Sequence, residues 1–217
     1  FDGNDDVLRI NNSADINTHS GHLSQKSYAL VFKTSGDINS RQVIYEEGGT
    51  VRGVNIFIQN GNLYFGAYNL PNDGAGAPWP FQSLSMSIQP NTEYIFTGVM
   101  DGNSSETGLM ASWLNGTSMG ELYTTGLLYA HSGAIALGAV RGDSYFFNSG
   151  AGGNHSYFEG EIAEFIYYRE AINNCERIIL ENYLSSKFNI ALANSDFFSL
   201  DDDANGNYDF ELAGIGQ

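Results

Sequence analysis

A cluster of three glutamates is the feature of this sequence most easily interpreted as an active site. Glu159, Glu161 and Glu164 lie in residues 157–168, where side chains alternate as they do in an extended strand. A retaining glycosidase needs two carboxyl groups that face one cleft about 5 to 5.5 Å apart. Alternate strand positions together with a local bulge provide such a separation. Hydrolysis of a glycosidic bond by Glu159 and Glu164 is therefore one hypothesis for this chain.

Aromatic side chains in two irregular segments suggest a different activity, the binding of a sugar. Flat aromatic faces pack against the C–H surfaces of sugars, while amides and carboxylates bond to the sugar hydroxyls. Trp79, between Pro78 and Pro80, is the strongest candidate platform. Its predicted companions come from the preceding strand and from the glycine-rich residues 141–157: Tyr68, Tyr145, Phe146, Asn154 and His155. The alternative is that each ring folds inward onto the hydrophobic core.

The acidic tail of the chain contains the spacing of a calcium-binding loop. Oxygen-bearing side chains recur there at alternate positions, and Gly206 stands where such a loop turns sharply. The candidate ligands are Asp201, Asp203, Asn205 and Asp209. Leu212 occupies the twelfth position, where a calcium loop carries a bidentate glutamate. A solvated acidic linker is therefore the alternative.

The charge of the chain excludes some classes of partner. Twenty-five acidic and nine basic residues give a net charge of -16, which repels phosphate backbones and anionic bilayers. We therefore expect no nucleic acid partner. We also expect no membrane insertion, because no apolar run approaches the roughly 20 residues that a spanning helix needs. Cations and neutral glycans remain as ligand classes.

Scattered histidines and a single cysteine give no catalytic arrangement. His19 and His22 are three residues apart, a spacing that on a helix would allow the two to bind one metal ion, but the Asn, Gly and Ser around them predict solvated loop histidines. Cys175 is the only cysteine, so no intrachain disulfide is available. Its place on the apolar side of a predicted helix indicates a small buried hydrophobic residue.

The pattern along the chain predicts an all-β fold. Short alternating segments separated by turn residues dominate up to residue 170, which is typical of an antiparallel β-sandwich or jelly roll. Asn60-Gly61 and Asn115-Gly116 predict two tight hairpins, because both central residues of that turn need positive φ. Other strands are expected near residues 7–10, 28–34, 42–46, 93–101 and 135–140.

After the last strand the apolar pattern changes period and predicts a helix. The apolar residues recur three and four apart: Ile172, Cys175, Ile179 and Tyr183, with Leu180, Leu184 and Phe188 beside them. Asn173 and Glu176 form the expected N-cap and its reciprocal partner. The sequence therefore predicts one sandwich domain over residues 1–190, which includes a helix over 173–188. Residues 191–217 form an acidic linker or the start of a following module.

The order of strand, short turn and helix, ending in Tyr183-Leu184-x-x-Lys187-Phe188, resembles the end of laminin-G-like, concanavalin A-like sandwich modules. Such modules occur in bacterial surface proteins of the Bacteroidetes type, and residues 91–102 and 111–116 are similar to two of their central strands. The resemblance implies an antiparallel jelly roll with one C-terminal helix. The superfamily also contains laminarinase-like glucanases, whose Glu-x-Asp-x-x-Glu catalytic strand has a spacing similar to that of the glutamate cluster, with Glu161 replacing aspartate.

The resemblance further implies a calcium ion between rim loops, as in many laminin-G-like modules. Asp73 and Asp143 are the residues that occupy the matching loops, and turn formation is the alternative role for both. In the tail, Asn205, Tyr208 and residues 212–216 are similar to the opening of another module in large surface proteins. Neighbouring modules of a larger protein are therefore expected partners.

These observations favour a noncatalytic binding module of a secreted or cell-surface, adhesin-type protein. The expected partner is a glycan or polysaccharide held by the rim loops, with calcium as the candidate cofactor. One alternative is a structural spacer without a ligand, and another is a laminarinase-like hydrolase that uses Glu159 and Glu164. The helix that directly follows the glutamates favours the noncatalytic interpretation, because it makes their strand a closing structural element.

Overall fold

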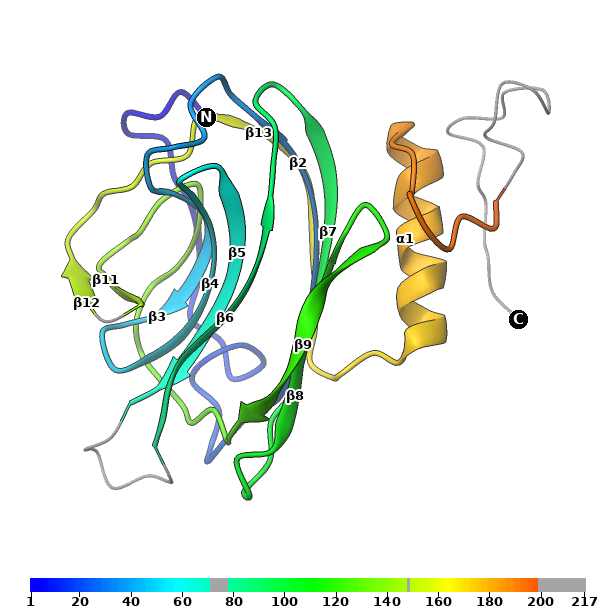
Figure 1. The fold of residues 1–217 in the computed structure, drawn as a ribbon. Coiled ribbons are helices and arrows are strands. Elements are labelled where there is room, and N and C mark those ends of the chain that lie inside the picture. Colours follow the sequence, from blue (N-terminus) through cyan, green and yellow to red (C-terminus); the bar gives the residue numbers. More distant parts are fainter. Residues whose placement is uncertain (71–77, 148, 199–217) are drawn as a thin grey trace.

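Two antiparallel sheets face each other and enclose the main hydrophobic core (Figure 1). The computed structural model describes residues 1–70, 78–147 and 149–198. One sheet has six strands in the order β1-β10-β3-β4-β5-β6, and the other has five in the order β13-β2-β7-β8-β9. The helix α1 lies outside the five-stranded sheet, and the hairpin β11-β12 lies outside the six-stranded one. The predicted β-sandwich with one C-terminal helix is confirmed.

The elements have the following bounds. The six-stranded sheet contains β1 (Leu8–Ile10), β3 (Gln42–Gly48), β4 (Arg52–Gln59), β5 (Asn62–Asn69), β6 (Trp79–Ser87) and β10 (Ile135–Leu137). The five-stranded sheet contains β2 (Gln25–Thr34), β7 (Glu93–Asp101), β8 (Gly108–Leu114), β9 (Thr117–Thr125) and β13 (Gly160–Tyr168). The remaining elements are β11 (Asp143–Phe146), β12 (Ser149–Gly152) and α1 (Asn174–Phe188).

Both predicted hairpins are present. Asn60 and Gly61 connect β4 to β5 with φ values of 51° and 74°, and Asn115 and Gly116 connect β8 to β9 with φ values of 47° and 74°. Asparagine and glycine tolerate this left-handed conformation, which matches the twist of the flanking strands. These turns set the register of two pairs of neighbouring strands.

The predicted helix cap is also present. The side chain of Asn173 accepts hydrogen bonds from the backbone N–H groups of Cys175 and Glu176. The Glu176 carboxylate in turn accepts one from the Asn173 N–H at 2.8 Å. The reciprocal arrangement satisfies backbone donors that the first turn of a helix leaves without partners.

The helix is rotated relative to the sequence prediction. Leu180 and Leu184 are buried against the five-stranded sheet, whereas Cys175 is exposed and Ile179 is 40% exposed. The prediction that Cys175 is a buried core residue is therefore wrong. Two adjacent apolar stripes run along α1, and the sheet covers only one of them.

The chain continues to pack on the sandwich after α1. Ile190 and Leu192 are buried, and the Ala193 N–H donates to the carbonyl of Asn115 at 2.9 Å. The boundary placed after residue 190 stays a prediction.

Candidate functional site

Four half-buried aromatic side chains form a surface on the outer side of the six-stranded sheet. Tyr64 comes from β5, Phe81 from β6, Tyr145 from β11, and Phe147 follows β11 directly. The Phe147 ring centroid lies 5.3 Å from that of Tyr64 and 5.6 Å from that of Phe81. The centroids of Phe81 and Tyr145 are 6.3 Å apart. We call these four residues the aromatic face.

Phe147 takes an unusual backbone conformation to reach this face. Its φ of 53° lies in the left-handed region, which costs a bulky residue about 1–2 kcal/mol. Edge-on packing of its ring against Phe57, Tyr64 and Phe81 offsets that cost. Backbone strain of this kind clusters at functional sites. The conformation of Phe147 therefore makes the aromatic face a candidate functional site.

A cleft of about 650 Å³ opens at the adjoining rim of the sandwich. It lies between the β3–β4 turn, residues 130–133 and the first residue of β11. Exposed hydroxyls and one exposed carboxylate contribute its polar lining: Thr18, Thr50, Ser132 and Asp143. Arg52 forms part of the wall, where its guanidinium donates to the Ala130 carbonyl at 3.0 Å and stacks over the Tyr129 ring. We call this the rim cleft.

Tyr68 joins the rim cleft to the aromatic face. Its buried hydroxyl donates to the Gly49 carbonyl in the β3–β4 turn at 2.6 Å and accepts from the Tyr145 N–H of β11 at 3.0 Å. Burial holds the pKa of this hydroxyl above its usual value, so it stays protonated and able to donate. The prediction that Tyr68 contacts a ligand is wrong because the side chain is fully buried. It positions the site instead.

The prediction that Trp79 is a platform for sugar binding is also wrong. Its side chain is 1% exposed, and its indole N–H donates to the Leu127 carbonyl at 3.0 Å. A Cβ atom on Gly126 would lie 2.5 Å from the Trp79 ring, so only glycine leaves room for it. Phe146 is buried as well, against Phe57. Both rings belong to the interior and cannot meet a sugar.

The other predicted ligand residues have different environments. Tyr145 belongs to the aromatic face, and Asp143 lines the rim cleft. Asn154 is exposed, and His155 is half-buried beyond the end of β12, where its Nδ1 lies 2.7 Å from the Ser156 hydroxyl.

The structure does not bring the glutamates of the hydrolase hypothesis together. The Glu159 carboxylate accepts from the Ser35 hydroxyl and lines a small hollow beside Arg41. Glu164 pairs with Lys187 at 2.7 Å and lines a separate groove. The two residues are five positions apart along an extended segment, so their α-carbons are separated by up to about 16 Å. The expected bulge lies between Ile162 and Glu164, yet the described geometry gives Glu159 and Glu164 no common cleft.

The calcium predictions fall mostly on residues that the structure does not describe. Asp73 lies outside the described residues, and so do the four tail candidates, Asp201, Asp203, Asn205 and Asp209. Asp143 is described and exposed at the rim cleft. It supplies one carboxylate, whereas calcium takes about six to eight oxygen ligands. The described residues alone do not form a calcium site at the rim.

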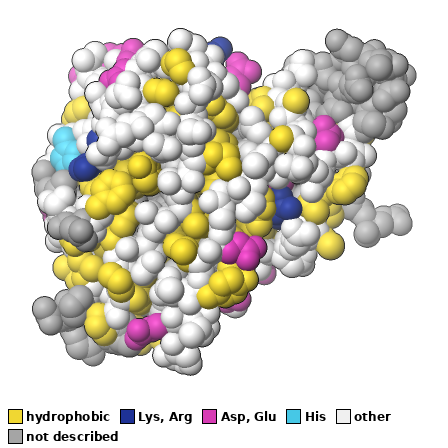
Figure 2. Space-filling view, in the orientation of Figure 1, with side chains coloured by type: hydrophobic (Ala, Val, Ile, Leu, Met, Phe, Trp, Pro, Cys, Tyr) yellow, Lys and Arg dark blue, Asp and Glu magenta, His cyan; other side chains and the backbone are white. Residues whose placement is uncertain are grey.

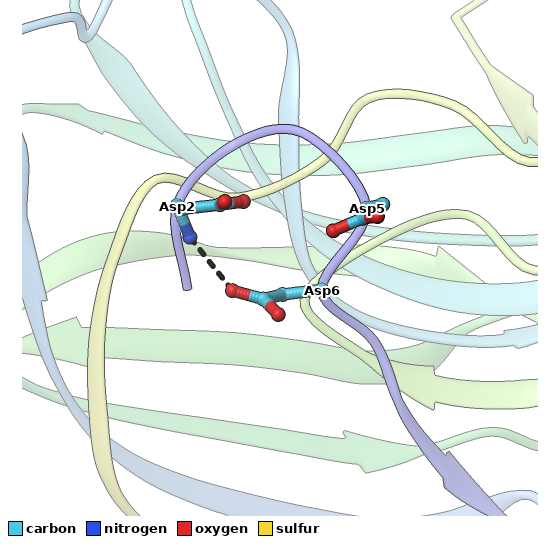
Figure 3. A group of neighbouring side chains, drawn as sticks. All are labelled: Asp2, Asp5 and Asp6. Atoms are coloured by element: carbon cyan, nitrogen blue, oxygen red, sulfur yellow. Dashed lines mark hydrogen bonds between the residues drawn. The ribbon is translucent and has the colours of Figure 1, made fainter.

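Three further carboxylates, those of Asp2, Asp5 and Asp6, gather near the start of the chain (Figure 3). All three are exposed, and their ligand atoms lie within 4.8 Å of one another. The Asp2 N–H donates to the Asp6 carboxylate at 2.9 Å, and hydrogen bonds from Asn4 lower the pKa of Asp2. Turn formation therefore accounts for the arrangement.

A buried polar cluster lies beneath the rim cleft. Lys26 and Glu47 form an ion pair with both side chains fully buried, and the Tyr45 hydroxyl donates to Glu47 at 2.8 Å. The His131 ring lines the cleft with its Nε2 3.8 Å from the Glu47 carboxylate. His19 is 6% exposed, and the His131 side chain is 6% exposed. The prediction that His19 is a solvated loop histidine is wrong.

The buried histidines predict a loss of stability in acid. Burial lowers the pKa of His19 from 6.5 to about 4, with further lowering by Lys26 and His131 and partial opposition from Glu47; burial also lowers the pKa of His131. Between pH 6.5 and 4 these two histidines therefore bind more protons in the unfolded chain than in the folded one, so their contribution to the free energy of unfolding falls as pH falls. His19→Gln is expected to reduce the number of protons taken up on unfolding by up to one, so that the free energy of unfolding falls less steeply with pH. Urea denaturation across that range measures this slope.

The exposed His22 provides the matched control. His22→Gln, measured in the same way, shows the effect of removing an exposed imidazole alone. Equal slopes for the wild type and His19→Gln would show that His19 gains its proton in the folded state.

The surface of the molecule is poor in basic groups. In Figure 2 the acidic side chains are scattered over the visible face, basic ones are sparse, and hydrophobic side chains reach the surface in both layers. Among the described residues, no helix is both long and apolar enough to cross a bilayer.

Comparison with known proteins places the fold. No protein-family model matches the chain, and no curated protein sequence matches it. The botulinum neurotoxin serotype D binding domain matches with a TM-score of 0.54 and 14% identity over 81% of this chain and 39% of that one. The Ruminococcus gnavus IT-sialidase CBM40 matches with a TM-score of 0.50 and 16% identity over 74% of this chain and 84% of that one. The fold is a jelly-roll β-sandwich.

The second match recurs in a structure of the same CBM40 bound to alpha2,3 sialyllactose, with the same TM-score and coverage. This chain spans only 39% of the toxin binding domain. At these levels of identity the likeness shows the fold alone, and function has to be argued from the site.

Tyr64, Phe81 and Phe147 are functional candidates that the sequence pattern does not single out. The available signal was the apolar character of both faces of residues 55–68, since Phe57 and Tyr64 alternate with the core residues Ile58 and Phe65. A strand that is apolar on both faces must be covered on both. The covering hairpin was visible only as a glycine-rich segment.

Proposed function

We propose that this chain is a noncatalytic carbohydrate-binding module that holds a glycan or polysaccharide on the aromatic face and in the adjoining rim cleft. The observation that carries the proposal is the set of half-buried rings beside a cleft lined by hydroxyls and a carboxylate. The structural likeness to CBM40, recorded with alpha2,3 sialyllactose, supports glycans as the ligand class. The lack of a common cleft for Glu159 and Glu164 supports binding without catalysis.

Each part of the site suits one part of a sugar. The exposed edges of Tyr64, Phe81 and Phe147 offer apolar surface to the C–H faces of pyranose rings. Thr50 and Asp143 offer hydrogen-bond partners to hydroxyls at the end of that surface. A net charge of -16 repels acidic sugars at low salt. A neutral polysaccharide is therefore the proposed ligand.

The proposal includes the setting expected from the sequence, a secreted or cell-surface protein of adhesin type in which this chain is one module. Calcium enters the proposal as a condition to be tested. Asp143 supplies one carboxylate to the rim, so binding should be measured both in calcium and in chelator.

The aromatic face can be tested without disturbing the fold. Phe147→Gly removes one ring, and it also relieves the left-handed strain because glycine adopts positive φ freely. We expect the best ligand from a broad glycan array to bind this variant at least about tenfold more weakly by calorimetry.

Tyr123→Ala is the matched control, because Tyr123 is an aromatic residue of β9 in the other sheet and is 61% exposed. It should bind the ligand as the wild type does. An array without neutral glycan ligands, or equal binding by Phe147→Gly and the wild type, would contradict the proposal. Equal affinity in calcium and in chelator would remove calcium from it.

A further inference from the structure

The apolar stripe of α1 that the sheet does not cover borders an open groove of about 530 Å³. Ile179 and Tyr183 form the helix side of this groove, and Ile166 and Tyr168 of β13 form the other. Ile179 is 40% exposed, and the remaining three are half-buried. Ile179 and Tyr183, which the helical periodicity placed on the apolar side of the helix, therefore lie at an unfilled surface.

The groove exists because α1 covers only the middle of its sheet. Leu180 and Leu184 pack against Val31 of β2 and Ile95 of β7. β13 is the edge strand of the five-stranded sheet, and its residues Ile166 and Tyr168 line the groove together with Ile179 and Tyr183 of the helix. A second segment lying alongside α1 would bury apolar surface on both walls.

Negative charge surrounds the groove. The carboxylates of Glu164, Glu170 and Glu176 line it, and all three add to the effect of burial in raising the pKa of Tyr168. Lys187 neutralises only Glu164, with its ammonium 2.7 Å from that carboxylate. Glu170 and Glu176 remain exposed at the rim of the groove. An occupant must therefore combine apolar side chains with positive charge.

We propose that this groove is a docking site for a basic, amphipathic peptide segment of another protein. Its aliphatic side chains contact Ile166 and Ile179, and its lysines or arginines face Glu170 and Glu176. A second copy of this chain would bring another net charge of -16 to an already acidic surface, which disfavours self-association through the groove. The groove lies outside the five-stranded sheet and the aromatic face outside the six-stranded sheet, so a peptide and a glycan can be held together.

The test uses fluorescence anisotropy with the full chain. The probe is a fluorescein-labelled amphipathic peptide of leucine and lysine about 14 residues long, and a leucine–glutamate peptide of the same pattern is the comparison. We expect the basic peptide to bind with a Kd on the order of 10 μM. Ile179→Ser and Glu170→Gln should each weaken binding by about fivefold to tenfold.

Two matched variants control for surface position. Leu8→Ser changes a residue of β1 that is 56% exposed, and Glu121→Gln removes one carboxylate from β9. Both should keep the wild-type affinity. No binding of the basic peptide, equal binding of the acidic peptide, or equal losses in groove and control variants would overturn the proposal. A dimer in sedimentation velocity that dissociates on Ile179→Ser would also overturn it, in favour of self-association.

Discussion

Lys26→Met is expected to lower the free energy of unfolding by about 3–5 kcal/mol at pH 7. The substitution leaves the Glu47 carboxylate fully buried without its ion-pair partner, and an unpaired charge in the interior is one of the most destabilising changes a fold can undergo. The Tyr45 hydroxyl remains as a donor to Glu47 at 2.8 Å, so some stabilisation of the carboxylate persists. Chemical denaturation at pH 7 measures the difference.

The same strand supplies a matched control. Lys33 of β2 pairs with Glu93 at 3.1 Å, but its side chain is 39% exposed, and exposed pairs contribute about 0–1 kcal/mol. Lys33→Met should therefore be nearly silent. The double variant Lys26→Met with Glu47→Gln should recover much of the lost stability, because neither charge remains buried. If Lys26→Met were as mild as Lys33→Met, the buried pair would not be ionised in the folded protein.

Glu46→Gln is expected to raise the free energy of unfolding by about 2–4 kcal/mol at pH 8. Glu46 is fully buried under the β11–β12 side of the sheet, and burial raises its pKa from 4.5 to about 9. The Arg141 N–H, which donates to its carboxyl group at 3.0 Å, opposes this shift, while Glu47 and Asp143 add to it. Its Oε2 has no hydrogen-bond partner among the described residues.

The sign of the effect follows from the raised pKa. The folded chain keeps a proton on Glu46 that the unfolded chain releases above pH 4.5, so the contribution of Glu46 to the free energy of unfolding falls as pH rises from about 4.5 towards 9. Glutamine keeps an acceptor for the Arg141 N–H and removes the titration. Glu46→Gln should match the wild type near pH 4 and exceed it at pH 8 in urea denaturation. A variant that gained nothing between these pH values would mean that Glu46 ionises normally in the fold.

Local signals in the sequence were sufficient for the turns and the helix start. Asn60-Gly61 and Asn115-Gly116 form their hairpins because few residue pairs tolerate two positive φ values in succession. Asn173 and Glu176 form their cap from side chains only three residues apart. In each case the residues that determine the structure are the residues that adopt it, which is why a single sequence predicts them.

Burial of particular side chains could not be predicted in this way. The prolines around Trp79 indicated an exposed loop, but the space for the ring is created by Gly126, far along the chain. The apolar periodicity of α1 identified the right residues without showing which stripe meets the sheet, so Cys175 was assigned to the core. The sequence around Lys26 does not indicate that its side chain is buried and paired with Glu47 inside the sandwich. All of these depend on contacts between distant segments.

The candidate site was predicted in part for the same reason. Tyr145 and Asp143 were identified from the glycine-rich segment, because local composition marked it as irregular. Tyr64 and Phe81 belong to β5 and β6, whose sequences predict strands but give no indication of a binding site. Their place beside Phe147 arises only when the β11–β12 hairpin folds over the outer side of the six-stranded sheet.

The hydroxyl of Tyr68 has a consequence for the energetics of ligand capture. It holds the β3–β4 turn and β11 together through hydrogen bonds with Gly49 and Tyr145, which are internal to the chain. The conformational entropy of ordering these two segments is therefore lost during folding rather than on association. A ligand that meets both of them finds a preorganised surface, so more of its contact energy appears as affinity.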